Sequence, residues 1–323
     1  MRLSVREVLQ LSQRSVWAAG VPRGVAGDIA EAIWWTEAYR GSGLEALHGL
    51  LEDPREFDAD APTIERQESM LSVVDGGGQP GIIVGEGVLD LSCARADRHG
   101  LGITYAKTGG CDRSHRTVGH LANRAARRGY PSVVMYTDET GGSTTVFGTP
   151  DDPRPLLAET GLDHASDSYR GLVGTIGADL EWDTDAPLAQ VAFGRRDDSG
   201  RFGPTDARTL DRLFAGSIES IGTPATQSPG IIVVCVDPYH PRHADAVGGV
   251  LKRFIEDRAG AGDIDTVFDP ETIRDRIRRL VEEGVEIDRS VWRDIFDAST
   301  GILAPPFEGS EKGAGFALNE LER

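Results

Sequence analysis

One short loop of this sequence gathers side chains that could move a proton and bind a carboxylate. Arg113, Ser114, His115 and Arg116 follow one another, shortly after an apolar segment that ends at Lys107. Histidine titrates near neutrality, which suits the protonation of a carbonyl oxygen, and arginine offers a planar, two-pronged donor to a carboxylate. The loop therefore indicates acid-base chemistry on a small carboxylic acid. A nucleophilic Ser114 activated by His115 is the alternative, although adjacent residues rarely present base and hydroxyl correctly.

The segments around this loop alternate between strand and helix patterns. Residues 101–106 (LGITYA) and 131–137 (PSVVMYT) are apolar enough for buried strands. Apolar positions recur at helical spacing over residues 82–99, where Gly100 is placed to end the helix, and over residues 117–128, and the sequence DGGGQPG at 75–81 predicts a turn. This alternation favours an α/β fold, with helices packed on a largely parallel or mixed central sheet.

Outside this centre, the chain divides into segments of different composition. The pattern predicts a helical N-terminal segment (1–58), in which Trp34 and Trp35 are core residues rather than a stacking platform for a cofactor. A central α/β region (59–225), with a loop rich in Gly, Thr and Pro after residue 135, precedes a closing strand and helices that pack back on the N-terminal segment (226–303). An irregular tail (304–323) ends the chain. The continuous apolar run at 230–236 is typical of a central strand, and helices are expected at 244–256 and 270–283.

The composition excludes several classes of function. Acidic residues outnumber basic ones 52 to 34, and a net charge of -18 opposes binding to nucleic acid or to an anionic membrane. We find no run of about 18 apolar residues, the length that a membrane span needs. The three cysteines show neither metal-binding spacing nor an even disulfide set, so we expect no metal and a cytoplasmic location. The acidic surplus has two interpretations, a well-solvated surface and, because several loops are rich in Asp, adaptation to a salt-rich cytosol.

Three blocks in the same order resemble the type 2 malate/L-lactate dehydrogenase family, whose NAD(P)-dependent members do not have a Rossmann fold. The blocks are VREVLQLSQRSVWAAGVPRGVAGDIAEAIWWTEAYRG near the N-terminus, DGGGQPGIIVGEGVLDLSCARADRHGLGITYAK with VGHLANRAARRGYPSVVM in the centre, and GIIVVCVDPYHPRHADAVGGVLKRFIEDRAGAG with DPETIRDRIRRLVEEGVEIDRSVWRDIF towards the end. The resemblance implies hydride transfer on a small 2-hydroxy or 2-oxo acid, NAD or NADP as cofactor, and a homodimer.

The resemblance also suggests where an acid/base group would lie. Matching the central block places Ser114 at the position of the family's acid/base histidine, with His115 one residue further on. Matching the first block places Glu45 where a second histidine is expected, and His48 follows one helical turn later. We therefore take His115, His48 and Ser114 as candidate catalytic residues. His120 is expected to lie too deep in the following helix.

Substrate and cofactor contacts follow from the same matching. Arg40, Arg113 and Arg116 are candidate anchors for the carboxylate of a small-molecule substrate, and Glu45 is a further candidate at the substrate. Gly148, Thr149 and Pro150 partly match the family's cofactor loop. The family's later glycine- and lysine-rich segment has no counterpart between residues 203 and 229.

Two functions remain open on the sequence. The first is a divergent NAD(P)-dependent oxidoreductase acting on a small 2-oxo or 2-hydroxy acid or on a cyclic imino acid. The second is a catalytically inactive member of the same fold that binds a metabolite or a partner subunit, since a fold alone does not determine a function.

Overall fold

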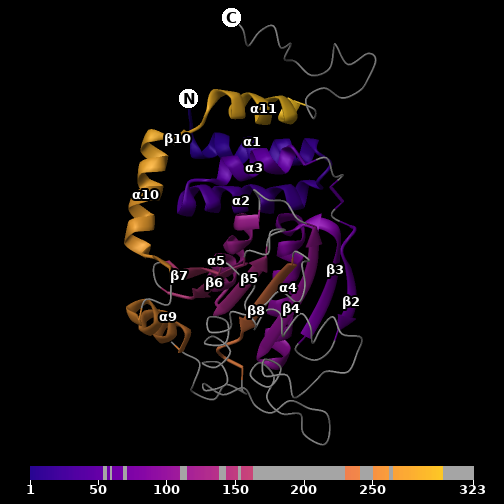
Figure 1. Cartoon of the computed structure of the whole chain (residues 1–323), viewed down its shortest axis with the longest axis vertical. Helices are drawn as coiled ribbons and strands as arrows, with labels where there is room; N and C mark the ends of the chain where they lie inside the picture. Colours follow the sequence, from indigo (N-terminus) through magenta and orange to yellow (C-terminus); the bar gives the residue numbers. More distant parts are fainter. Residues whose placement is uncertain are drawn as a thin grey trace, which may run out of the picture.

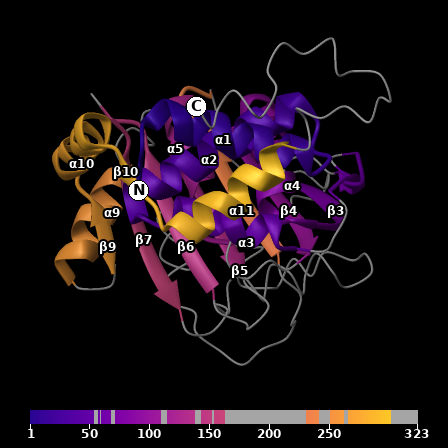
Figure 2. The same cartoon turned by 90° about the horizontal axis from the view of Figure 1, so that it is seen from above.

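The molecule has a layer of helices packed against a sheet (Figure 1). The computed structural model describes residues 1–53, 57–58, 60–67, 71–109, 115–137, 143–151, 154–162, 230–240, 250–261 and 265–300. The helical layer contains α1 (Val5–Ala18), α2 (Arg23–Arg40), α3 (Gly43–Leu51) and α11 (Arg289–Thr300). Seen from above, these helices cross over the strands of the sheet (Figure 2).

The helical layer joins the start of the chain to its later part. The short strand β1 (Arg2–Leu3) pairs antiparallel with β10 (Val285–Glu286). Ser4 then begins α1 with a capping box, in which its hydroxyl accepts the backbone N–H of Glu7 and the Glu7 carboxylate accepts the Ser4 backbone N–H. Apolar residues of α1, α2, α3 and α11 form one continuous core with β10.

The sheet of the described residues has eight strands in the order β2-β3-β4-β8-β5-β6-β7-β9. Only β3 and β4 run parallel, and every other neighbouring pair is antiparallel. Of the two predicted arrangements, the mixed sheet is therefore confirmed and the largely parallel one is wrong. The strands are β2 (Thr63–Gln67), β3 (Leu71–Pro80), β4 (Leu101–Gly109), β5 (Ser132–Thr137), β6 (Ser143–Thr149), β7 (Leu156–Leu162), β8 (Gly230–Val236) and β9 (Thr266–Phe268).

The central strand is the one that the sequence marks most clearly. Every residue of β8 is buried, and β8 lies between β4 and β5 although it follows them by more than 90 residues. The helices α4 (Gly81–His99) and α5 (His120–Arg127) pack on one face of the sheet and share a core with it. Gly102 in β4 allows the close approach of α4, because a Cβ there would lie 1.8 Å from the carbonyl oxygen of Ser92.

Two local predictions differ from the structure. The segment predicted as a turn continues β3 as far as Pro80, although its register shifts after Asp75 and Gly77 and Gly78 keep positive φ angles of 61° and 72°. The loop predicted after residue 135 contains β6, because Val146 and Phe147 are buried in the sheet and outweigh the Gly- and Thr-rich composition around them.

The helix predicted at 117–128 also begins differently. A 3₁₀ turn, η1 (His115–Gly119), leads into α5. Gly129, which has a positive φ angle, follows the C-terminal end of α5. The remaining helices are α9 (Val250–Ala261) and α10 (Pro270–Glu283), of which α10 has the predicted bounds. The predicted irregular tail lies outside the described residues.

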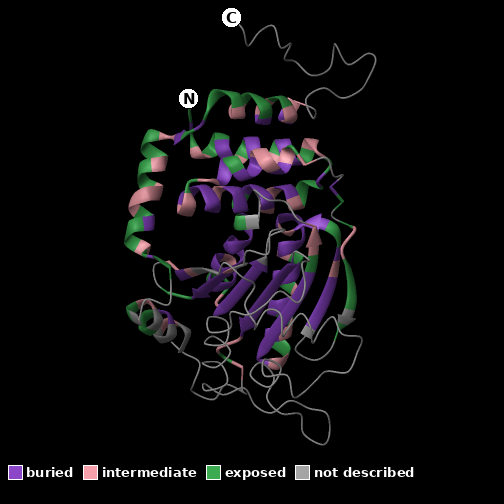
Figure 3. Cartoon of the chain, in the orientation of Figure 1, coloured by how far each residue is buried: buried purple, intermediate pink, exposed green. Residues whose placement is uncertain are grey.

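One helix belongs to both layers. Ile29 and Ile33 of α2 pack in the helical core, whereas Trp35 of the same helix packs in the core of the sheet. Figure 3 shows α2 buried along most of its length. Because α2 is covered on both sides, its C-terminal end lies in the seam between the helices and the sheet, and Arg40 is its last residue.

Candidate functional site

Arg40 is the centre of a buried polar group in the seam. Gly41 ends α2 in the left-handed conformation (φ 74°), and its N–H donates to the Glu37 carbonyl 2.9 Å away. The Arg40 side chain is 10% exposed and crosses to the sheet, where it forms an ion pair with Glu159 of β7. Its Nη1 donates to the Tyr136 hydroxyl of β5 at 3.3 Å. The guanidinium therefore ties α2 to two strands.

A second predicted arginine approaches the same carboxylate. Arg116 is an exposed residue of η1, and its charge acts on Glu159. The same 3₁₀ turn lies against Arg40, since a Cβ on Gly119 would be 2.9 Å from Arg40 Nη2. Of the predicted carboxylate anchors, Arg40 thus pairs directly with Glu159, and Arg116 acts on the same carboxylate through its charge.

The charges of this group perturb one another. Burial raises the pKa of Glu159, and Arg40 and Arg116 lower it only in part, so its pKa stays above the ordinary value of 4.5. Burial alone would lower the pKa of Arg40, but Tyr136 and Glu159 raise it. The pKa of the Tyr136 phenol is raised, chiefly by burial. The site therefore keeps a fixed positive charge beside a carboxyl group whose pKa is raised above its ordinary value.

Two buried N–H groups next to this ion pair have no partner among the described residues. They are the Nε of Arg40 and the Nε1 of Trp35, and the guanidinium carbon lies 5.4 Å from the centre of the indole ring. Trp35 is 5% exposed and stacks on Tyr39, with Phe268 against both rings. Buried donors are nearly always satisfied in folded proteins, so these two point to an acceptor that the described residues do not provide.

The predicted catalytic loop is only partly described. Arg113 and Ser114 lie outside the described residues. His115 is the first residue of η1, the turn that also carries Arg116 and Gly119, and its side chain is outside the described part. Its backbone therefore belongs to the turn packed against Arg40, and its catalytic role stays a prediction.

The candidates on α3 have other surroundings. His48 Nε2 lies 3.1 Å from Asp294 Oδ2 of α11 and 3.7 Å from Glu52 Oε1, contacts that tie α3 to the outermost helix. Glu45 is exposed in the first turn of α3, where a carboxylate favours the positive end of the helix dipole. Structural contacts thus account for the position of His48, and roles for both residues at a substrate stay predictions.

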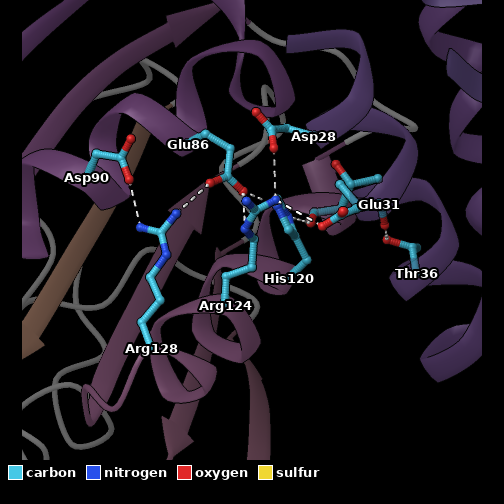
Figure 4. Close-up of polar contacts among 10 residues, drawn as sticks. Asp28, Glu31, Thr36, Glu86, Asp90, His120, Arg124 and Arg128 are labelled. Carbon is cyan, nitrogen blue, oxygen red and sulfur yellow. Dashed lines mark hydrogen bonds and ion pairs between the residues drawn. The ribbon is translucent and has the colours of Figure 1, made fainter. Parts of the chain in front are cut away.

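A larger ionic cluster joins α2, α4 and α5 (Figure 4). The carboxylate of Glu86 in α4 accepts from His120 Nε2 at 2.9 Å and from Arg124 Nε at 3.1 Å, and Arg128 Nη2 is 3.5 Å away. His120 Nδ1 donates to the Thr117 carbonyl at 2.7 Å. His120 is 3% exposed, which agrees with its expected depth in the helix. Both of its ring nitrogens are engaged, so it joins α4 to α5.

Comparison with solved structures identifies the fold. Malate dehydrogenase from Entamoeba histolytica aligns with a TM-score of 0.59 over 95% of this chain and 99% of its own, at 12% identity. Malate dehydrogenase from Pyrococcus horikoshii gives 0.57 over 94% and 96% at 14% identity. Delta1-piperideine-2-carboxylate reductase from Pseudomonas syringae gives 0.55 over 92% and 99%, also at 14%. The chain has the fold of these enzymes. The sequence itself matches no known family model and no curated protein.

Within this malate dehydrogenase-like fold, the predicted cofactor loop is filled by the protein itself. A Cβ on Gly148 would lie 2.5 Å from the carbonyl oxygen of Ala122 in α5, so this glycine serves helix packing. Thr149 is 4% exposed, and Pro150 is exposed beyond the end of β6. Gly148 and Thr149 are covered by the protein and Pro150 has no N–H to donate, so this segment offers the phosphates of a dinucleotide little access.

Other kinds of site receive no support from the described part of the chain. It contains no group of three or more His, Cys, Asp or Glu side chains placed to hold a metal ion. No helix in it has the length and apolarity to cross a bilayer. Cys93 and Cys235 are buried free thiols with their sulfur atoms 3.9 Å apart, and Cys111 lies outside the described residues.

Sequence reasoning missed three members of the site, which are Trp35 as a donor, Tyr136 and Glu159. Glu159 had a signal in the sequence, because it interrupts the apolar run Leu156-Leu157-Ala158, and a charged residue in a buried strand needs a partner. Tyr136 and Trp35 carried none, since each looks like an ordinary core aromatic.

Proposed function

We propose that this chain is a divergent NAD(P)-dependent oxidoreductase that acts on a small 2-oxo or 2-hydroxy acid, or on a cyclic imino acid. The observation that supports it best is the buried ion pair of Arg40 with Glu159 beside η1, the turn that begins with His115 and whose Arg116 acts electrostatically on the same carboxylate. The fold adds weight, because the compared structures include two malate dehydrogenases and an imino acid reductase.

The proposed roles follow from the chemistry of the side chains. Arg40 and Arg116 bind the substrate carboxylate, for which a planar guanidinium gives two parallel hydrogen bonds. His115 holds the proton that the carbonyl oxygen receives during reduction and takes it back during oxidation. Trp35, Tyr39 and Phe268 exclude water from the inner side of Arg40. NAD or NADP is the proposed cofactor, held by residues other than those of the segment 148–150.

An inactive, metabolite-binding chain is the second candidate. The filled space at Gly148 favours it, because the segment expected to hold the cofactor does not form a cradle. On this alternative, Arg40 would still bind an acid, but no hydride transfer would follow.

Calorimetric titration of the chain with NADH and with NADPH separates the two candidates. The oxidoreductase should bind at least one of them below about 1 mM, the upper end of the usual range for substrates. Adenosine serves as the control ligand, because it lacks both nicotinamide and phosphates. Absence of binding to both reduced cofactors at millimolar concentration would rule out the oxidoreductase and leave the inactive acid-binding chain.

A further inference from the structure

Glu159 already occupies Arg40 as a substrate carboxylate would. Four groups act on it: Arg40 from α2, Arg116 from η1, Asp265 from the residue before β9, and Tyr136 through their common partner Arg40. The Glu159 side chain is 21% exposed, whereas the Arg40 side chain behind it is 10% exposed. A ligand that arrives from solvent therefore meets Glu159 first and reaches the guanidinium only if that carboxylate gives way.

The unpaired donors show what lies behind the ion pair. Arg40 uses Nη1 for Tyr136 and Nη2 for Glu159, which leaves Nε without an acceptor in the described part of the chain. The Nε1 of Trp35 is likewise buried and unpaired, and the indole ring lies 5.4 Å from the guanidinium carbon. An internal carboxylate held at one edge of the guanidinium thus leaves two strong donors unused. The Glu159 carboxylate is attached to β7, whereas the two oxygens of a free carboxylate can be placed to accept from more of these donors.

We propose that a small carboxylate ligand displaces Glu159 from Arg40, accepts a hydrogen bond from Trp35, and is bound together with one proton that Glu159 takes up from solvent. This inference rests on the proposed acid-binding role of Arg40, and it adds a gate and a proton linkage to that role. The ligand class is a monoanionic 2-oxo or 2-hydroxy acid, because Arg40 is the buried cation of the site and the exposed Arg116 acts on it only through its charge on Glu159.

The proton follows from the charges that would share the site. In the free protein, Arg40 and Glu159 neutralise each other behind the exposed Arg116. A bound anion takes over the guanidinium, so that Glu159 faces Asp265 and the ligand with only Arg116 in compensation. Two carboxylates in one buried site rarely both stay ionised. Burial already raises the pKa of Glu159 in the free protein, so protonation is the smaller further change.

Calorimetric titration of the wild-type chain with pyruvate is the first test, carried out in two buffers of different ionisation enthalpy between about pH 5 and about pH 9. We expect uptake of about one proton per pyruvate bound, and an affinity that falls about tenfold per pH unit above the pKa of Glu159. Pyruvamide, which lacks the carboxylate, is the matched control and should not bind. Binding of pyruvate without proton uptake, or the absence of binding to pyruvate at millimolar concentration, overturns the proposal.

Two variants then assign the effects to residues. In Glu159→Gln the proton uptake should disappear, and the affinity for pyruvate should become independent of pH and exceed that of the wild type at high pH. In Trp35→Phe the affinity should fall about tenfold, the loss expected for one hydrogen bond to a charged group. Trp34→Phe is the matched control, because Trp34 packs in the helical core on the other side of α2. A Glu159→Gln variant that keeps the wild-type pH slope contradicts the gate.

These outcomes are separate from those of the proposed function. Proton-linked pyruvate binding without binding of NADH or NADPH would support the gate and remove the oxidoreductase. If the chain binds NADH or NADPH and its pyruvate binding is independent of pH, the oxidoreductase is supported and the Glu159 gate is excluded. If Glu159→Gln does not fold, the proton uptake of the wild type decides the question alone.

Discussion

At the scale of single residues, the site is built around one guanidinium with incomplete hydrogen bonding. Arg40 has an internal carboxylate and a phenol as partners, yet its Nε and the neighbouring indole N–H remain unpaired in the described part of the chain. Leaving a buried donor unsatisfied costs about 1 to 3 kcal/mol. A ligand that satisfies these donors recovers part of that free energy, which is a physical reason for such a site to bind an acid.

The first prediction concerns His115. If it is the acid/base group, His115→Asn should lower kcat with 2-oxo acids by about 100-fold or more, since positioned proton transfer contributes that much. The KM for the acid should change little, because Arg40 and Arg116 bind the carboxylate. His240→Asn is the control, because His240 follows the end of β8 that lies away from Tyr136. Steady-state rates decide the point, and equal rates for wild type and His115→Asn would exclude the role.

At the scale of elements, the cluster around Glu86 holds the site-forming turn in place. It joins α4 to α5, and α5 continues directly from η1. Burial raises the pKa of Glu86, but the combined effect of His120, Arg124 and Arg128 is larger and opposite. The pKa of this carboxyl group therefore lies below 4.5. A group with a lowered pKa in the folded state stabilises the protein above its unfolded pKa and loses that contribution as the pH falls.

The second prediction follows from this sign. Glu86→Gln should reduce the free energy of unfolding by about 2 kcal/mol at neutral pH, because charge-assisted hydrogen bonds to a partly buried carboxylate are lost. The difference from wild type should shrink as the pH falls below 4.5. Asp90→Asn is the matched control on the same helix, since Asp90 is 65% exposed and its ion pair with Arg128 should contribute less than about 1 kcal/mol. A difference that does not change with pH in urea unfolding would contradict this account.

The third prediction concerns Gly148. Gly148→Ala should destabilise the fold by about 1 to 3 kcal/mol, because the added methyl group meets backbone of α5 rather than open space. Gly87→Ala is the matched control, since Gly87 lies on the exposed side of α4 with nothing within 4 Å. That change should stabilise the chain by about 0.5 to 1 kcal/mol, as alanine favours a helix. A Gly148→Ala variant as stable as the wild type would contradict the packing role of Gly148 and would again favour segment 148–150 as a cofactor loop.

The sequence was informative where local patterns decide the structure. The run 230–236, the helix 270–283 and the glycine after residue 99 were predicted correctly, because burial, a Pro start and a left-handed cap each leave a local mark. Strand β6 was missed, since its pairing with β5 and β7 depends on distant partners. The contact between Arg40 and Glu159 joins residues 119 positions apart, and no spacing along the chain encodes it.

At the scale of the whole molecule, the fold and the charge are the main features. The fold is similar to that of two malate dehydrogenases at 12% and 14% sequence identity, and no family model matches the sequence. The net charge of -18 is large for 323 residues, and the resulting repulsion between carboxylates opposes the compact state.

The fourth prediction is that salt stabilises the chain. Its thermal unfolding midpoint should rise by several degrees between low salt and about 1 M KCl, because a Debye length of about 3 Å screens the repulsion. The rise should be smaller near the isoelectric point, where the net charge vanishes. Differential scanning calorimetry provides the midpoints, and the same midpoint in both salt concentrations would disprove an adaptation to salt.

The initial rate of NADH and NADPH oxidation in the presence of small 2-oxo acids and a cyclic imino acid tests the proposed oxidoreductase most directly. We predict turnover with at least one of these acids, loss of turnover with the corresponding amide, and a weaker apparent affinity at higher pH. A folded chain that oxidises neither cofactor above the protein-free rate with any of the acids would contradict the proposed oxidoreductase.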